Sequence, residues 1–453
     1  MKLKEWFQWF KEVPWAVKWF VILILLRPII DNFYKLKEVS PFLSPLNIVG
    51  ALTPILIFLS VISNKLSVKS RSGVGIYFFI FGFIVIVNWV ILDILFPDID
   101  TIGNSIKAVT PPLLLFYLMY VIRSQRDLHG MLVTFLYSGI YMAGMLFYEY
   151  IFGSISGITL TEGRGGGERF TGVYNDMMNY AIYISGAMLI GGYFYLRNIY
   201  SMSRSKNYTL RFAIIIAICV MGLVGIKHVA TWGVCLALFC VLALFNLKNF
   251  KGFFVLLFAS GIFLIFFGES FYQKQIEPLI GKEINVASGE YASEGGLNGR
   301  IGRWERYFDV WFNDMPWYSR FLGVATSGNR ISLVMCGAGM HNDFVRNLFT
   351  AGIIGLVFYI VFLLLILYRA MYFKVPEKFL IIGSVVMVLL YSVSTVPLAY
   401  SSLIYFILTI FSFALLPVKK AYLIQPWKMK KVKKRNRFHP AIHQPTEPAQ
   451  LSS

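Results

Sequence analysis

Long apolar runs separated by short polar segments fill the chain from residue 16 to residue 417. A helix that crosses the hydrocarbon core of a bilayer needs about 20 largely apolar residues. The runs of this kind are 16–30, 46–63, 74–96, 104–122, 131–153, 174–196, 211–226, 229–246, 252–268, 344–368, 378–396 and 399–417. We therefore expect an all-α polytopic membrane protein with about twelve transmembrane helices.

One long polar segment, residues 269–343, interrupts this pattern and is expected to lie outside the membrane. Within it Trp304, Phe308, Trp311 and Phe312 recur at helical spacing, which predicts an amphipathic helix lying along the outer membrane surface. The chain then divides into an N-terminal bundle of about nine spans (1–268), this external loop (269–343), C-terminal spans (344–417) and a basic tail without stable structure (418–453).

Composition and charge fix the class and the orientation. With 57% hydrophobic and 14% charged residues the chain is too apolar for a soluble protein. If both termini are cytoplasmic, 27 of the 42 Lys and Arg residues fall on the cytoplasmic side, as the positive-inside rule requires. The net charge of +19 then reflects orientation and contact with anionic membrane lipids rather than binding of nucleic acid. No segment with the pattern of a cleavable signal peptide is recognised at the start of the sequence, so we expect a multi-pass protein of the inner-membrane type.

The sequence shows no recognisable motif for binding a cofactor or a metal ion. Neither a phosphate-binding loop of the Walker A type nor a dinucleotide fingerprint is present, so no cofactor is expected. The cysteines have no CxxC spacing, and only His228 and His341 fall on the outer side, which is too few for a zinc site. Asp93, Lys107 and Glu149 fall in the outer part of their spans, whereas a transporter is expected to place such groups near the midplane.

Cationic side chains gather on the predicted outer face and favour an anionic substrate. Arg300 stands near the start of the amphipathic helix, where backbone N–H groups and the helix dipole attract an anion. Lys227, at the sharp turn between two spans, needs an anionic partner close to the lipid boundary. Together with Arg169 and Arg303 these residues predict a site that holds a lipid-linked pyrophosphate without a metal ion.

Four motifs occur in one order and together resemble the integral-membrane O-antigen ligases and the related O-antigen and exopolysaccharide polymerases. They span Arg169 to Leu356, and each is weak by itself. The residues that carry them are Arg169, Gly172, Tyr174, Asn179 and Ala181; the turn Gly225-Ile226-Lys227-His228; Gly299, Arg300 and Trp304; and His341, Asn342, Gly352 and Gly355. The chain departs from the family where Asn175-Asp176-Met177-Met178-Asn179 replaces Asn-Pro-Asn and where Lys227 replaces arginine.

The resemblance implies glycosyl transfer at the outer face of the inner membrane from an undecaprenyl-pyrophosphate-linked glycan. His341 would be the general base that takes the proton of the acceptor hydroxyl, because an imidazole has an unperturbed pKa of ~6.5. Asn342 or Asp343 would orient its ring. Arg169, Lys227 and Arg300 would hold the pyrophosphate, while Asp176 or Asn179 would contact sugar.

Three functions remain open from the sequence. If the acceptor is another lipid-linked repeat unit, the protein is a polymerase, which we favour slightly. If the acceptor is the core oligosaccharide of lipid A, it is a ligase. A flippase for lipid-linked sugars is the alternative without catalysis, and the outward position of the charged residues argues against it.

Overall fold

A computed structural model describes residues 3–33, 36, 40, 43–63, 99–155, 169–174, 177–201, 206–246, 285–286, 288, 296–324, 341–396 and 400–422. No strand occurs among these residues. The helices are α1 (Leu3–Glu12), α2 (Trp15–Asp31), α4 (Pro45–Ser63), α6 (Ile99–Val121), α7 (Gln125–Phe152), α8 (Met178–Ile199), α9 (Lys206–Ile226), α10 (Val229–Phe245), α13 (Gly296–Asp309), α14 (Trp317–Leu322), α16 (Asp343–Ala370), α17 (Val375–Ser394), α18 (Ser401–Ala414) and α19 (Val418–Ala421).

Several of these helices have the dimensions of membrane spans. α4, α7, α9, α16 and α17 are long and apolar enough to cross a bilayer, while α10, α18 and the 110–121 part of α6 are shorter apolar helices. Ten of the twelve predicted runs coincide with helices, and the runs 74–96 and 252–268 lie outside the described residues. The protein is therefore a helical membrane protein, and the figure of twelve spans stays a prediction.

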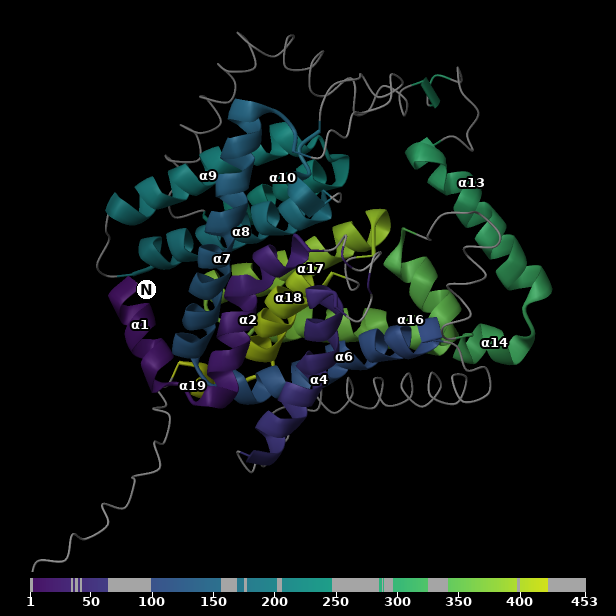
Figure 1. Ribbon diagram of the computed structural model, residues 1–453, viewed down its shortest axis with the longest axis horizontal. Helices are drawn as coiled ribbons and strands as arrows, with labels where there is room; N and C mark the ends of the chain where they lie inside the picture. The colour runs from purple at the N-terminus through teal and green to yellow at the C-terminus, as the bar shows by residue number, and fades with distance from the viewer. Residues whose placement is uncertain are drawn as a thin grey trace, which may run out of the picture.

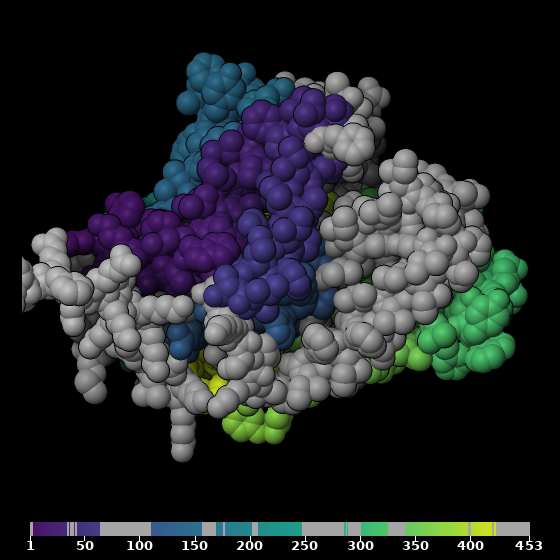
Figure 2. Space-filling model, turned by 60° about the horizontal axis from the view of Figure 1, so that its bottom comes forward, coloured from purple at the N-terminus to yellow at the C-terminus, as the bar shows by residue number. Residues whose placement is uncertain are grey.

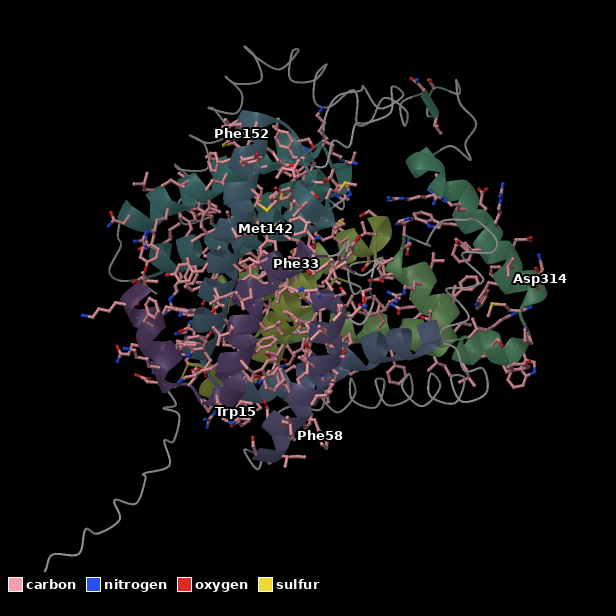
Figure 3. All side chains as sticks on the ribbon, in the orientation of Figure 1. Trp15, Phe33, Phe58, Met142, Phe152 and Asp314 are labelled. Carbon is pink, nitrogen blue, oxygen red and sulfur yellow. The ribbon has the colours of Figure 1, made fainter. Side chains whose placement is uncertain are left out.

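The helices surround one apolar core. α8 packs against α9, α10 and α17, and α18 packs against α6, α7 and α17, so that α17 and α18 run through the middle of the bundle (Figure 1). Figure 3 shows Met142 inside and Phe58 and Phe152 at the periphery. Met142 is 2% exposed, whereas Phe58 and Phe152 are 61% and 70% exposed, as expected for side chains that face lipid.

The two ends of the described chain meet at one end of the bundle, which we call the α1 end. Trp9 packs over Gly130, where a Cβ would lie 2.4 Å from the indole, and its Nε1 donates to Asp127 at 3.1 Å. Glu377, at the start of α17, accepts hydrogen bonds from Gln125 and, at 3.2 Å, from Tyr422. α1, the start of α7 and the residue after α19 thus share this end, and α13 and α14 lie at the opposite edge (Figure 2).

α16 is broken at Gly352, and the short helix α14 fills the break. Gly352 has φ +66° and ψ −171°, so the nine residues from Asp343 to Ala351 form a half-helix set apart from the longer part, as Figure 1 shows. A Cβ on Gly352 would lie 2.2 Å from the Phe321 carbonyl oxygen, and one on Gly323 would lie 2.5 Å from the Thr350 carbonyl oxygen. Two glycines therefore let two backbones touch. The Val324 N–H donates to the Phe349 carbonyl at 2.9 Å across this joint.

Adding a side chain at this joint should be costly. Gly352→Ala should lower stability by about 1–3 kcal/mol through its left-handed backbone alone, and by more because the neighbouring atoms belong to backbone that has little room to move. The check is the thermal unfolding of the detergent-solubilised protein. Gly233→Ala is the matched control, because a Cβ on this helical glycine meets nothing within 4 Å. Equal melting temperatures for Gly352→Ala and the wild type would contradict the close backbone contact between α14 and α16 at Gly352.

The predicted amphipathic helix is present, but its aromatic face is divided. Tyr307, Trp311 and Met315 are buried in a second apolar cluster against the half-helix, where Val345, Leu348 and Phe349 complete it. Phe308 and Phe312 remain 39% and 58% exposed. The predicted aromatic face is therefore confirmed only in part, because Trp311 packs inside the protein four residues after Tyr307, and a π-helical turn, Val310–Asp314, follows α13.

Candidate functional site

The turn between α9 and α10 carries the first unusual backbone. Lys227 has φ +46°, a left-handed conformation that is uncommon for a residue other than glycine, asparagine or aspartate. His228 follows in an extended conformation at the N-cap of α10, and its Nδ1 lies 2.7 Å from the Thr231 hydroxyl. The sharp turn predicted at Lys227 is therefore confirmed, and it is built with local strain.

Arg169 holds this turn from the segment before α8. Its Nε donates to the Ile226 carbonyl at 2.7 Å and its Nη2 to the Lys227 carbonyl at 2.6 Å. The neighbouring Phe170 N–H donates to the Gly225 carbonyl at 3.0 Å. Arg169 is only 9% exposed. The structure thus brings Arg169 and Lys227 together, and it gives the guanidinium a structural task that sequence reasoning did not foresee.

The electrostatics of His228 bring Arg300 of α13 into the same neighbourhood. Burial, followed by the positive charges of Arg169 and Arg300, lowers the pKa of His228 to about 3. His228 is therefore neutral throughout the physiological pH range, although its ring is partly exposed. The charges of Arg169 and Arg300 act on this neutral imidazole, and Lys227 directly precedes it in the chain, so the fields of these cations would add at an anion bound there.

One detail of the Arg300 prediction is wrong. α13 begins at Gly296, so Arg300 lies in the second turn of the helix instead of at its start. The first four N–H groups of a helix are the ones without an intrahelical partner, and the N–H of Arg300 comes after them. An anion near Arg300 would therefore be held by its side chain and not by free backbone N–H groups.

His341 is the second residue with strained backbone. Its φ is +45°, and among the described residues it and Lys227 are the non-glycine residues with positive φ. It is solvent-exposed. Directly after it, the Asn342 Oδ1 caps α16 by accepting from the N–H groups of Phe344 and Val345 at 2.9 and 3.1 Å. The predicted helix start is confirmed, and the capping bonds direct the Asn342 side chain toward α16.

The last turn of α17 lies close to the residues that follow Lys227 and His341 in the sequence. On one side, the Tyr391 hydroxyl lies 3.4 Å from the Thr231 hydroxyl, which contacts His228. On the other side, the Asn342 Nδ2 donates to the Val393 carbonyl at 3.4 Å. The residues that follow Lys227 and His341 in the sequence, His228 and Asn342, are thus linked to the same end of α17, His228 through Thr231 and Asn342 directly. We define the candidate site as Arg169, Lys227, His228, Arg300 and His341.

The remaining predicted residues lie around this site or outside the described part of the chain. Arg303 is half-buried one turn beyond Arg300 on α13, and Asn179 is half-buried in the first turn of α8. Asp343 is 1% exposed and lies 4.0 Å from the Arg346 guanidinium. Asp176 lies outside the described residues.

An apolar cavity of 270 Å³ lies between α7, α8 and α9. Small residues, Gly139, Ala143 and Ala187, make part of its wall. Tyr180 also lines it, and the Tyr180 hydroxyl donates to Glu149 at 2.9 Å, close to the segment that carries Arg169. Through Tyr180 and Glu149 the wall of the cavity is therefore linked to the segment that carries Arg169.

In the part of the chain that the structure describes, no three His, Cys, Asp or Glu side chains are placed to hold a metal ion together. Comparison with protein-family models and with curated protein sequences finds no match for this chain.

Proposed function

We propose that this protein is a membrane glycosyltransferase that polymerises lipid-linked oligosaccharide repeat units at the outer face of a bacterial inner membrane. The observation that carries the proposal is the pairing of two strained residues. Lys227 and His341 have complementary chemistry and both adopt left-handed backbone, and their sequence neighbours His228 and Asn342 are linked to the end of α17, His228 through Thr231 and Asn342 directly. Such strain clusters at functional sites because folding retains it only where the surroundings enforce it.

The proposed donor is a glycan on undecaprenyl pyrophosphate. Lys227 and Arg300 would neutralise the pyrophosphate, and Arg169 would hold the Lys227 turn in place through its two carbonyl contacts. The apolar cavity beside Tyr180 has room for part of the isoprenoid chain. These features suit a ligand with a doubly anionic head and a long hydrocarbon tail.

The proposed reaction is a displacement at the anomeric carbon. The acceptor hydroxyl oxygen forms a bond to that carbon, the carbon–oxygen bond to pyrophosphate breaks, and the pyrophosphate leaves with the electron pair. His341 takes the proton of the hydroxyl. Attack from the face opposite the leaving group inverts the anomeric configuration. Positive charge at Lys227 and Arg300 stabilises the charge that develops on the leaving group.

The decisive assay is glycan transfer by purified protein with a lipid-linked oligosaccharide as donor. A repeat-unit acceptor should give chain extension, whereas transfer only to a lipid A core oligosaccharide would make the protein a ligase. Movement of the lipid across the bilayer without any transfer would make it a flippase. Activity should survive EDTA, and a strict metal requirement would contradict the proposed role of the cations.

The proposed orientation has its own test. In a cysteine-free background, Asn313→Cys beyond α13 should react with an impermeant maleimide in spheroplasts, because Asn313 is exposed at the proposed outer side. Lys4→Cys on α1 should react only after the membrane is permeabilised. The proposal follows from the basic residues assigned to the cytoplasm. Labelling of Lys4→Cys but not Asn313→Cys in intact spheroplasts would reverse the orientation.

A further inference from the structure

Glu149, one turn from the end of α7, is a fully buried acidic residue that the proposed reaction does not use. Its exposed fraction is 0%. One carboxyl oxygen accepts from the N–H of Ile155 at 3.2 Å and from the N–H of Gly172 at 3.0 Å. The other accepts from the Tyr180 hydroxyl at 2.9 Å. Donors from the residues after α7, from the segment before α8 and from α8 itself therefore converge on one side chain.

These donors mark the two ends of the segment between α7 and α8. Ile155 follows the end of α7, and Gly172 opens the 3₁₀ turn Gly172–Tyr174 that precedes α8. One more hydrogen bond joins the two ends of this segment, because the Ser154 hydroxyl donates to the Arg169 carbonyl at 3.0 Å. The chain that leaves α7 is thereby fastened to the chain that returns to α8, and Arg169 lies at the fastened point.

The residues at this fastened point, Arg169 and Phe170, also contact the turn at Lys227. Besides the two guanidinium bonds described above, the backbone of Phe170 bonds to Gly225. Gly225 lacks a side chain where one would collide, since a Cβ would lie 2.4 Å from the Phe170 ring. The contact is therefore close and specific. A displacement of Arg169 would remove three hydrogen bonds from the turn that presents Lys227.

We propose that Glu149 is the positioning residue of the cationic site. It acts through the fastened segment and Arg169 on the turn at Lys227, and it does not touch the substrate. The inference rests on the proposed function for its consequence in catalysis, while the contacts themselves are independent of any reaction. Burial makes the carboxyl group hard to replace, because its three donors would otherwise be left without an acceptor.

Kinetic constants of three variants test this role. Glu149→Ala should raise the KM for the lipid-linked donor about tenfold or more, with a smaller change in kcat, because the cations that hold the donor are displaced. Glu149→Gln should recover most of the loss, since its amide oxygen still accepts from both N–H groups and the Tyr180 hydroxyl can accept from its NH₂. Equal, unchanged KM values in Glu149→Ala and the wild type would overturn the proposal.

A double-mutant cycle shows whether Glu149 acts through Arg169. If it does, adding Glu149→Ala to Arg169→Ala should change the donor KM by less than about twofold. Arg169→Ala alone already removes the guanidinium contacts through which Glu149 would act on the turn at Lys227. Full additivity of the two effects would contradict the proposed route. Glu377→Ala is the matched control, because Glu377 is 1% exposed and accepts from two tyrosine hydroxyls at the α1 end. It should reduce thermal stability without a change in donor KM; a KM rise equal to that of Glu149→Ala would make the effect merely structural.

Hydrogen exchange separates this inference from the proposed reaction. In Glu149→Ala the amides of Ile155, Phe170 and Gly172 should exchange faster, while exchange in α17 should be unchanged. This measurement needs no substrate. If these amides exchange faster in Glu149→Ala but the wild type transfers no glycan, Glu149 keeps its positioning role and the proposed function is wrong. Unchanged exchange at all three amides would remove the positioning role, whatever the protein catalyses.

Discussion

Replacement of His341 by alanine or by glutamine should lower glycan transfer about 10²–10⁴-fold while donor binding is largely kept. The ring is exposed at the N-terminal side of the half-helix, and its left-handed backbone is held by the Asn342 cap that follows. A general base is needed only in the step that transfers the proton, so kcat should fall much more than donor KM rises. The measurement is steady-state transfer with purified variants.

The pH profile gives the same prediction a second check. Transfer by the wild type should fall on the acidic side near the ordinary imidazole pKa of ~6.5, because a protonated base cannot accept a proton. Burial and the charges of Arg169 and Arg300 lower the pKa of His228 to about 3, so we expect the acidic limb to come from His341 and not from His228. His228→Ala should therefore be milder than His341→Ala and keep the acidic limb. If His341→Gln keeps more than about a tenth of wild-type turnover, the histidine is not the base.

Removal of the cations should have the second largest effect. Arg300→Ala and Lys227→Ala should each lower kcat/KM for the donor roughly 10- to 150-fold, the equivalent of losing one charge-assisted contact of about 1.5–3 kcal/mol. Arg300→Lys should recover only part of the loss, because a lysine cannot form the paired contacts of a guanidinium. Inhibition of transfer by inorganic pyrophosphate, used as a probe of the anion site, should weaken in parallel.

The control for the cations is another arginine at the other end of the molecule. Arg211, on α9, is exposed near the α1 end and stacks on Tyr208 at 5.8 Å. Arg211→Ala removes the same charge from the chain but should leave donor KM and pyrophosphate inhibition unchanged. A similar loss in Arg211→Ala would mean that net charge, and not the local site, controls donor binding. Normal chain lengths from Arg300→Ala at native expression would remove that residue from the site.

The helices were predictable because apolar runs end where polar residues begin. The run 46–63 became α4 at Pro45–Ser63, and the run 229–246 became α10 at Val229–Phe245. The break in α16 was not predictable, because a glycine inside an apolar run usually continues the helix. Its cause, the backbone of Phe321 and Gly323, lies in a segment whose pattern does not point to α16.

The candidate site was predictable in its residues but not in its connections. Charged residues near a membrane boundary are costly and therefore rare, so Lys227 and Arg300 could be predicted as candidate residues from the sequence. Nothing in the sequence assigns Arg169 to backbone carbonyls, because such bonds follow from how the α9–α10 turn is placed. The left-handed backbone of His341 also leaves no trace in residue type, since histidine is not required there.

The length of the second part of α16 can be compared with the thickness of a bilayer. The part of α16 after Gly352 has 18 residues, Ile353–Ala370. At 1.5 Å per residue it is ~27 Å long, close to the ~30 Å thickness of the hydrocarbon core. If this part spans the bilayer, Gly352 lies near the edge of the hydrocarbon core, and the backbone of Phe321 and Gly323 surrounds it there, as non-helical backbone at membrane depth requires. The half-helix adds no more than ~14 Å beyond that level. His341 therefore lies at most ~14 Å beyond the lipid tails, a distance that exceeds the ~5–8 Å headgroup layer of each face, so the histidine would reach a sugar that projects past a lipid pyrophosphate.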